Sequence, residues 1–304
     1  MLIEQIIIFG AISSGVYALL ALGFTLIYGV SGVTNLAHGS FYMLGAYMFF
    51  VLCSFFDDLF GSGMVSTSIL ALILAVIFVG IVGILTYRIA IHPIVGDQVA
   101  VMVITVCLAL VFQQSVLLIF GPTFPPVRWP EGSFLVISTA ILGVTVQYSR
   151  ILAFVVSLGL FSSLLVFITK TKIGKAMRAV SQDREVAMLM GINTERLYML
   201  TMALSAMLAA LASILITTST SMSAGAWMWL YPLALSFSIV ILGGLGSIKG
   251  SLVGGFIVGY AEQTVAIVVP EGGAIVGVVP LVVMLIVLLL RPKGLFGKRV
   301  ELEE

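Results

Sequence analysis

Charged residues divide this chain into long apolar segments. No Asp, Glu, Lys or Arg occurs in the 52 residues between Glu4 and Asp57, or in the 52 residues between Arg196 and Lys249. Four further charge-free segments of 19 to 30 residues lie at 59–87, 98–127, 151–169 and 272–290. About 20 apolar residues cross a hydrocarbon core about 30 Å thick. Each 52-residue segment can therefore hold two membrane spans, and each shorter segment can hold one.

These segments, with one more that contains Glu262, predict about eight or nine transmembrane helices. The expected spans are residues 3–30, 41–56, 68–87, 99–120, 151–169, 197–216, 230–245, 251–269 and 275–290. A β-barrel is not expected, because barrel strands alternate over about 10 residues, whereas these segments are continuously apolar. The pattern predicts an all-α polytopic membrane protein in which residues 1–304 form a single transmembrane domain.

Residues 121–150 depart from this pattern. Four prolines, at positions 122, 125, 126 and 130, interrupt their first half, and β-branched residues are frequent in their second half. β-branched residues next to turn signals favour strands. We therefore predict an external loop with a small β-hairpin or cap, and a tenth, short membrane span is the competing interpretation.

The composition agrees with a membrane protein and excludes other classes. Only 9% of the 304 residues are charged, against about 25% in a soluble domain, and the mean hydropathy is +1.25. The formal net charge is +1 and no long basic face exists, which excludes a nucleic-acid-binding protein. Cys53 and Cys107 lie in apolar segments, as packed thiols rather than a disulfide.

The positions of the cations predict the orientation in the membrane. Six of the 14 Lys and Arg residues lie at 170–196, and four more lie at 291–299. Cytoplasmic loops carry such an excess of cations. With nine spans, the N-terminus is then expected outside the cell and the C-terminus in the cytoplasm.

Asn35, His38 and Gly39 interrupt the first 52-residue apolar segment. Polar residues and glycines at membrane depth are typical of a broken helix or re-entrant turn, which is tolerated where protein or a water-filled cavity satisfies its backbone. These residues are candidates for the wall or inner gate of a translocation path. The alternative is an ordinary tight inner turn with His38 bonded to a neighbouring carbonyl. A metal site is not expected, because His92, the other histidine, has no ligand cluster around it.

Glu262 is the only acid well inside an expected span. Such a residue is a functional candidate, here for the translocation path. The alternative is a structural carboxyl near the outer boundary that is hydrated or hydrogen-bonded. Gly254, Gly255 and Gly259 precede it, and glycines allow membrane helices to approach closely.

Residues 171–195 predict two short amphipathic helices. Apolar residues recur in them at helical spacing: Ile173, Met177 and Val180, then Val186, Leu189 and Met190. Ser181 or Asp183 can cap the second helix, and Gly191 with Asn193 can end it. One interpretation is a basic helix lying on anionic lipid.

The spacing Glu185-x-Ala187-x-x-x-Gly191 resembles the coupling motif of ABC-transporter permeases, in which a short helix sits in a cleft of an ATPase subunit. The resemblance implies that the small Ala187 and Gly191 allow close approach to that subunit. It also implies that nearby charges fix the register of the contact, with Arg178, Asp183 and Glu185 as the candidates.

Nearly the whole chain resembles the branched-chain amino acid ABC-transporter permease family, specifically its smaller permease subunit. The residues that carry the resemblance lie at 35–39, 42–47, 174–179, 189–193, 243–250 and 291–297. Lys249 departs from the family's pattern, in which a proline often precedes the residue equivalent to Gly250. The resemblance implies a cell-membrane subunit, not an enzyme, that forms the path for branched-chain or other apolar amino acids.

The resemblance also implies three kinds of partner besides membrane lipid: a second, homologous permease, two cytoplasmic ATPase subunits that use ATP, and an external solute-binding protein. The chain has no phosphate loop of the form Gly-x-x-x-x-Gly-Lys-Ser/Thr, so it needs no cofactor of its own. An importer of urea or short amides is the alternative within this class. An ion-coupled secondary transporter or channel subunit fits less well, because the spans hold almost no ionisable residues for a proton relay.

Overall fold

The structure is a computed structural model that describes residues 2–61, 65–121, 129, 133–220, 225 and 227–297. The first helices are α1 (Leu2–Ser31), α2 (His38–Phe60), α3 (Val65–Thr86), α4 (Gln98–Phe120) and α5 (Tyr148–Lys170). They are followed by α6 (Lys172–Gln182), α7 (Arg184–Leu189), α8 (Thr194–Thr220), α9 (Leu230–Gly243), α10 (Ile248–Val268), α11 (Gly272–Ile275) and α12 (Val279–Leu290). A π-helical turn, η1 (Tyr87–Ile91), and a 3-10 turn, η2 (His92–Ile94), join α3 to α4, and the strands are β1 (Ser138–Ile141) and β2 (Val144–Gln147).

Eight helical segments in the described part of the chain are long and apolar enough to cross a membrane. They confirm the all-α polytopic class, and the chain is a multi-pass membrane protein. The remaining expected span, at 230–245, is the shorter helix α9 of 14 residues. At about 1.5 Å per residue α9 extends over about 21 Å, less than the thickness of the hydrocarbon core.

The expected β-hairpin is confirmed. Strands β1 and β2 pair antiparallel from Ser138 opposite Gln147 to Ile141 opposite Val144. Both turn residues have positive φ, 51° at Leu142 and 80° at Gly143, as a two-residue turn that follows the strand twist requires. The competing interpretation of a membrane span is therefore wrong for residues 138–147. The prolines at positions 122, 125, 126 and 130 lie outside the described residues.

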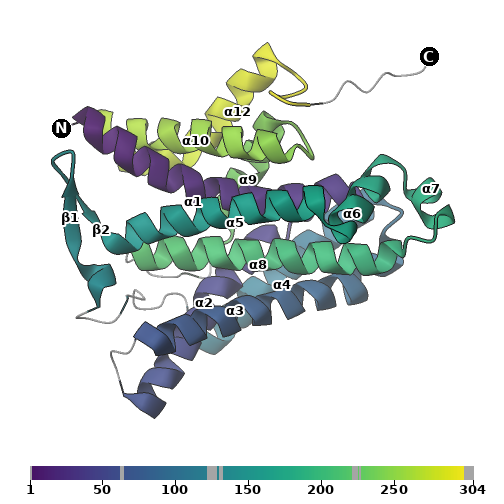
Figure 1. Cartoon of the computed structure of the whole chain (residues 1–304), viewed down its shortest axis with the longest axis horizontal. Coiled ribbons are helices and arrows are strands. Elements are labelled where there is room, and N and C mark those ends of the chain that lie inside the picture. Colours follow the sequence, from purple (N-terminus) through teal and green to yellow (C-terminus); the bar gives the residue numbers. More distant parts are fainter. Residues whose placement is uncertain are drawn as a thin grey trace.

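Two long helices form the centre of the bundle. In the most apolar 18-residue windows of α1 and α8, 56% and 67% of the residues are buried, against 6% in the span that ends with α12. Helix α1 contacts α10, α8, α5 and α9. Figure 1 shows α1, α5 and α8 running along the long axis, with the hairpin and the N-terminus at one end and α6 and α7 at the other.

Glycines set the close contact between α1 and α10. A Cβ atom added to Gly255 would lie 2.8 Å from the backbone of Ala18, and one added to Gly259 would lie 2.8 Å from the backbone of Ser14. Gly254 faces Ile239 of α9, whose carbonyl oxygen would lie 2.8 Å from an added Cβ. The expectation that these glycines allow close helix packing is confirmed.

The C-terminal segment after α12 covers the end of α9. The backbone N–H of Leu295 donates to the carbonyl of Leu242 at 2.9 Å, and that of Phe296 donates to the carbonyl of Gly243 at 3.0 Å. A helix leaves its last carbonyls without partners inside the helix, and the segment supplies donors for two of them. The glycine-rich segment at 243–250 and the segment at 291–297 are thus parts of one packed corner.

Candidate functional site

Helices α6 and α7 form a small cap at the end of the bundle away from the hairpin (Figure 1). Thr171 caps α6 through its hydroxyl, which accepts from the N–H of Gly174 at 3.0 Å. Met177 and Val180 are buried against the bundle, whereas Ile173 is exposed. The expected amphipathic face of α6 is therefore confirmed at two of its three positions.

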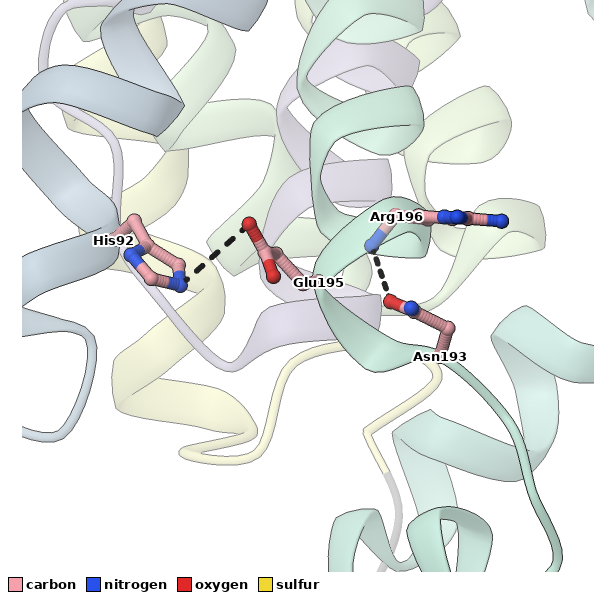
Figure 2. Close-up of polar contacts among 4 residues, drawn as sticks. All are labelled: His92, Asn193, Glu195 and Arg196. Atoms are coloured by element: carbon pink, nitrogen blue, oxygen red, sulfur yellow. Dashed lines mark hydrogen bonds and ion pairs between the residues drawn. The ribbon is translucent and has the colours of Figure 1, made fainter.

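Helix α7 has well-defined ends. The carboxylate of Asp183 accepts from the N–H of Val186 at 3.0 Å and so caps the first turn. At the other end Gly191 has φ = +82°, and the N–H groups of Gly191 and Ile192 donate to the carbonyls of Met188 and Ala187. This pair of bonds is a Schellman motif. Asp183 and Gly191 are confirmed as the end signals of α7. Asn193, expected to help end α7, instead caps the start of α8, where its Oδ1 accepts from the N–H of Arg196 at 3.0 Å (Figure 2).

The large apolar side chains of α7 and its C-cap residue point outward, away from the helix bundle. Val186, Met188, Leu189 and Met190 are 53%, 45%, 86% and 78% exposed. The apolar side chains predicted at helical spacing, Val186, Leu189 and Met190, therefore lie on the outer surface of the cap rather than against the bundle. Exposed apolar patches mark interaction surfaces. We call these four residues the α7 patch.

The five expected coupling residues divide into two groups. Glu185 is exposed beside the α7 patch, and Gly191 is exposed at its end. Ala187 is 4% exposed and packs against the helix bundle. Its small size therefore allows α7 to pack closely on this chain. Arg178 donates from Nη2 to the carbonyl of Thr169 at 3.2 Å, near the end of α5. Asp183 and Arg178 therefore also shape the cap itself.

Aromatic contacts join α7 to the bundle. The guanidinium of Arg184 lies 5.6 Å from the centre of the Tyr198 ring. Tyr198 contacts Tyr87 with ring centres 6.1 Å apart, and Tyr87 contacts His92 at 6.0 Å. His92 Nε2 also lies 3.7 Å from Glu195 Oε1 (Figure 2). This last pair is half exposed and contributes little to stability, so the aromatic rings form the main link.

The break between α1 and α2 lies deep in the bundle. Gln98, the first residue of α4, donates to the carbonyl of Gly32 at 3.5 Å, and Thr105 accepts from the N–H of Leu36 at 3.2 Å. Seven residues of α4 separate these contacts, a rise of about 10 Å. His38 Nε2 contacts the carbonyl of Leu20 at 3.1 Å, eleven residues before α1 ends. The start of α2 thus lies about 10 Å deeper in the bundle than Gly32, which a tight inner turn does not produce.

Side chains satisfy the irregular backbone of this re-entrant segment, residues 32–37. Asn35 Oδ1 accepts from the N–H of Ala37 at 3.0 Å, and its Nδ2 lies 3.6 Å from Met202 Sδ. His38 is fully buried, and its Nδ1 lies 3.2 Å from the hydroxyl of Ser205. Such partners are what irregular backbone at membrane depth requires. The bond from His38 to a neighbouring carbonyl is also confirmed.

Gly39 lies where the starts of α2 and α9 meet. A Cβ atom at Gly39 would overlap the carbonyl oxygen of Trp229 and lie 2.9 Å from Leu233 Cβ. Helix α9 therefore begins beside the re-entrant segment rather than at the end of the bundle, which accounts for its shortness. Two interrupted helices meet at this level, as in transporters whose broken helices line a substrate path.

A cavity of about 590 Å³ occupies the bundle between this level and the hairpin end. Helices α1, α2, α5, α8, α9 and α10 contribute to its wall. Its apolar lining includes Val16, Ile216 and Leu235, and its polar lining includes Tyr42 and Gln263. Ligand pockets are typically about 300–1,000 Å³ and mostly apolar with a few polar groups. Asn35, His38 and Gly39 do not line this cavity, but Leu20, which His38 contacts, does.

Glu262 lies behind the cavity wall. Its side chain is fully buried, and its Oε1 accepts from the hydroxyl of Tyr231 at 2.6 Å. Its Oε2 has no hydrogen-bond partner among the described residues. Tyr17 also interacts with the Tyr231 hydroxyl and with the Glu262 carboxyl. The hydrogen bond agrees with the structural alternative for Glu262, but burial excludes the hydrated outer position.

Sequence reasoning missed Arg150, the one charged residue among the described residues that line the cavity. The sequence shows it only as the last charge before a span, and a helix-flanking arginine is common in membrane proteins. Tyr17 and Tyr231 were missed for a related reason, because tyrosines in apolar segments give no signal of what they face. A cavity formed by six helices is a product of long-range packing.

Comparison with known proteins gives consistent matches along the chain. A family model described as "Branched-chain amino acid transport system / permease component" matches residues 6–288. The chain is 32% identical over 302 residues to the high-affinity branched-chain amino acid transport system permease protein BraD of Pseudomonas aeruginosa, covering 97% of this chain and 95% of that protein. It is 28% identical over 299 residues to LivH of Escherichia coli, the permease protein of the same kind of system, covering 95% and 94%. A probable branched-chain amino acid transport permease protein of Methanocaldococcus jannaschii is 30% identical over 311 residues, covering 97% and 93%.

Proposed function

The chain belongs to the family of permease components of branched-chain amino acid transport systems, and we propose that it is a membrane-spanning subunit of an ABC importer for these amino acids. The match of the family model over residues 6–288 carries this conclusion. The eight long apolar helices supply the spans that such a subunit needs. The relatives are permeases rather than enzymes, and none of them favours urea or short amides as the substrate.

Energy is proposed to enter through the α7 patch. The chain has no phosphate loop, so ATP must be bound by partner subunits. The α7 patch exposes four apolar side chains, with Glu185 beside them. An ATPase subunit that covers this patch would remove apolar surface from water. In this proposal Glu185 and Gly191 contact the ATPase, whereas Arg178, Asp183 and Ala187 hold the cap in the shape that the ATPase meets.

The orientation follows from the same assignment. Helices α6 and α7 then face the cytoplasm together with the C-terminal segment, and the N-terminus and the β-hairpin face the outside. The six cations at 170–196 support this arrangement. The outer surface near residues 121–150 and 219–229 is the proposed contact for an external binding protein. A second, homologous permease completes the membrane part of the importer.

The cavity is proposed as the outer part of the translocation path, and the re-entrant segment as part of its inner gate. Directly below the cavity, Phe24 contacts His38 and Phe237 with ring centres 5.6 Å and 5.9 Å apart. These rings close the bundle toward the cytoplasmic end. Asn35 and Gly39 hold the start of α2 in place beside them, and Glu262 supports the wall above.

The proposed cycle uses these parts in order. A loaded binding protein docks outside and releases the amino acid into the path. ATP binding closes the ATPase pair and displaces α6 and α7. Because α6 and α7 are fastened to α5 and α8, their displacement rocks these spans and opens the ring layer toward the cytoplasm, a form of alternating access.

Leu189 is the sharpest test position for the ATPase contact. Leu189→Ala removes an 86% exposed side chain, so it leaves folding of this chain intact. Burial of a leucine is worth about 1.5–3 kcal/mol, and we expect the ATPase to bind about tenfold more weakly or worse. The measurement is the affinity of the purified permease pair for its ATPase subunits.

Leu118→Ala is the matched control, because Leu118 is 77% exposed on α4, far from the cap. It should bind the ATPase like the wild type. Equal affinities for all three proteins would refute the assignment of the α7 patch. Gly191 is a poor test position, since any side chain at φ = +82° strains the backbone.

A further inference from the structure

A cation without a counter-ion lines the cavity. Arg150 is half-buried at the start of α5, its Nε donates to the carbonyl of Ser219 at 3.2 Å, and its guanidinium lies 5.0 Å from the centre of the Phe9 ring. No carboxylate in the described part of the chain pairs with it. A half-buried charge is costly unless it is paired. The remaining N–H groups of the guanidinium therefore suit an anionic ligand.

The chemistry of Arg150 favours a carboxylate. A guanidinium presents parallel N–H groups that match the two oxygens of a carboxylate. The bond from Nε to Ser219 and the contact with Phe9 hold the group at the cavity wall. A neutral ligand such as urea or a short amide would leave this charge unpaired.

Acceptor groups line another part of the same cavity. Tyr17 and Tyr231 contribute to its wall, and the hydroxyl of Tyr231 donates its hydrogen to Glu262. The oxygen of Tyr231 is then left with lone pairs to accept from a ligand. The fully buried Glu262, with one oxygen unpartnered among the described residues, lies behind it. With its hydrogen donated to Glu262, the Tyr231 oxygen offers lone pairs that suit an ammonium group.

Most of the remaining lining of the cavity is apolar. Val16, Ile216 and Leu235 belong to the lining, and the volume of about 590 Å³ is typical of a pocket for a small ligand. A cation, hydroxyl acceptors backed by a carboxyl, and an apolar wall are the three parts needed for an α-amino acid with an apolar side chain.

We propose that this cavity is a binding site for the amino-acid zwitterion within this one subunit. Arg150 binds the carboxylate, Tyr17 and Tyr231 backed by Glu262 bind the ammonium group, and the apolar wall takes the branched side chain. The inference deepens the proposed function, on which it rests, by naming the groups that select a zwitterion over neutral amides.

The test uses the complete importer in detergent, without its binding protein, so that only the membrane part can bind ligand. The probe is radiolabelled leucine at equilibrium. The competitors are isovalerate, which lacks the ammonium group, and isoamylamine, which lacks the carboxylate. Wild-type importer should bind leucine at least about tenfold more tightly than either competitor, because each lost charge-assisted contact costs about 10–100-fold.

The variants should lose selectivity in opposite directions. Arg150→Gln should lower the affinity for leucine to the affinity for isoamylamine, and it should leave the affinity for isoamylamine unchanged. Glu262→Gln should lower the affinity for leucine to the affinity for isovalerate, and it should leave the affinity for isovalerate unchanged. A general packing defect would weaken all three ligands, so this crossed pattern separates recognition from structure. Lys249→Gln, which removes an exposed cation at the other end of the bundle, should change nothing.

Arg150→Lys provides a check in case the glutamine variant fails to assemble, since it keeps the charge and should lose only part of the leucine affinity. Equal binding of leucine and isoamylamine by the wild type, or unchanged binding by the Arg150 variants, would overturn the inference. In either case ATP-driven leucine uptake by the wild type would leave the proposed function standing. Absence of that uptake would count against the proposed function itself.

Discussion

At the scale of single residues, missing side chains set the distance between α1 and α10. The backbone atoms of Ser14 and Ala18 lie 2.8 Å from where a Cβ of Gly259 or Gly255 would be. Backbone atoms in the middle of a helix cannot move aside as a flexible side chain can. A larger residue at either position must therefore push α1 and α10 apart.

Gly255→Leu should destabilise the protein by about 1–3 kcal/mol or more, the usual cost of overpacking a core. Its midpoint of thermal unfolding in detergent should fall clearly below that of the wild type. Gly159→Leu is the matched control, because Gly159 also lies inside a helix but faces open space. The account of α1–α10 packing is wrong if both variants unfold at the wild-type temperature.

Single residues also show where sequence reasoning works and where it stops. Asp183 and Gly191 were predictable as helix ends because capping depends on local chemistry. The close approach at Gly255 was predictable because glycine spacing in a span has few other uses. The role of Arg150 was not predictable, because it depends on whether a carboxylate lies beside the guanidinium in the folded chain. Ala187 was assigned to a partner surface, but it packs inward, since the residue pattern alone does not fix the rotation of a six-residue helix.

At the scale of elements, the cap of α6 and α7 is joined to the spans by a row of rings. Arg184 lies over Tyr198, Tyr198 contacts Tyr87, and Tyr87 contacts His92. Tyr87 and His92 belong to η1 and η2, the junction between α3 and α4. A displacement of α7 can therefore reach α3 and α4 as well as α8.

Tyr198→Ala should uncouple ATP hydrolysis from transport. Removal of the ring breaks both aromatic contacts, each worth about 0.5–1.5 kcal/mol, while the α7 patch stays in place for the ATPase. We expect the number of leucine molecules transported per ATP hydrolysed to fall several-fold in proteoliposomes. Tyr198→Phe keeps the ring and should behave like the wild type. An unchanged ratio in Tyr198→Ala would show that the rings do not transmit the motion.

The elements themselves were largely predictable from hydropathy. Continuous apolar segments gave the spans, and β-branched residues beside turn signals gave the hairpin. The depth at which α2 and α9 begin was not predictable. Hydropathy does not reveal a stretch of irregular backbone whose hydrogen bonds are made by neighbouring side chains. The outward direction of the apolar face of α7 was not predictable for another reason. Helical periodicity identifies residues that share a face, but it does not say what covers that face.

At the scale of the whole molecule, the two candidate regions lie at opposite ends of the same long helices. Helix α1 has 30 residues and spans about 45 Å. Six of its residues between Phe9 and Leu20 line the cavity, whereas Tyr28 to Ser31, with the following Gly32, line a second cavity of about 760 Å³ next to α6 and α7. Helix α8 likewise carries Tyr198 near the cap and Ser219 in the wall of the first cavity. Energy and substrate are thus proposed to enter at the two ends of a shared, buried pair of helices.

The central claim is that ATP hydrolysed by partner subunits drives amino acid transport through this chain. The direct measurement is uptake of radiolabelled leucine into proteoliposomes that contain this chain, the second permease, both ATPase subunits and the binding protein. We predict uptake that requires ATP inside the vesicles and persists when proton and sodium gradients are abolished. Uptake by this chain alone that follows an ion gradient and ignores ATP would contradict the account.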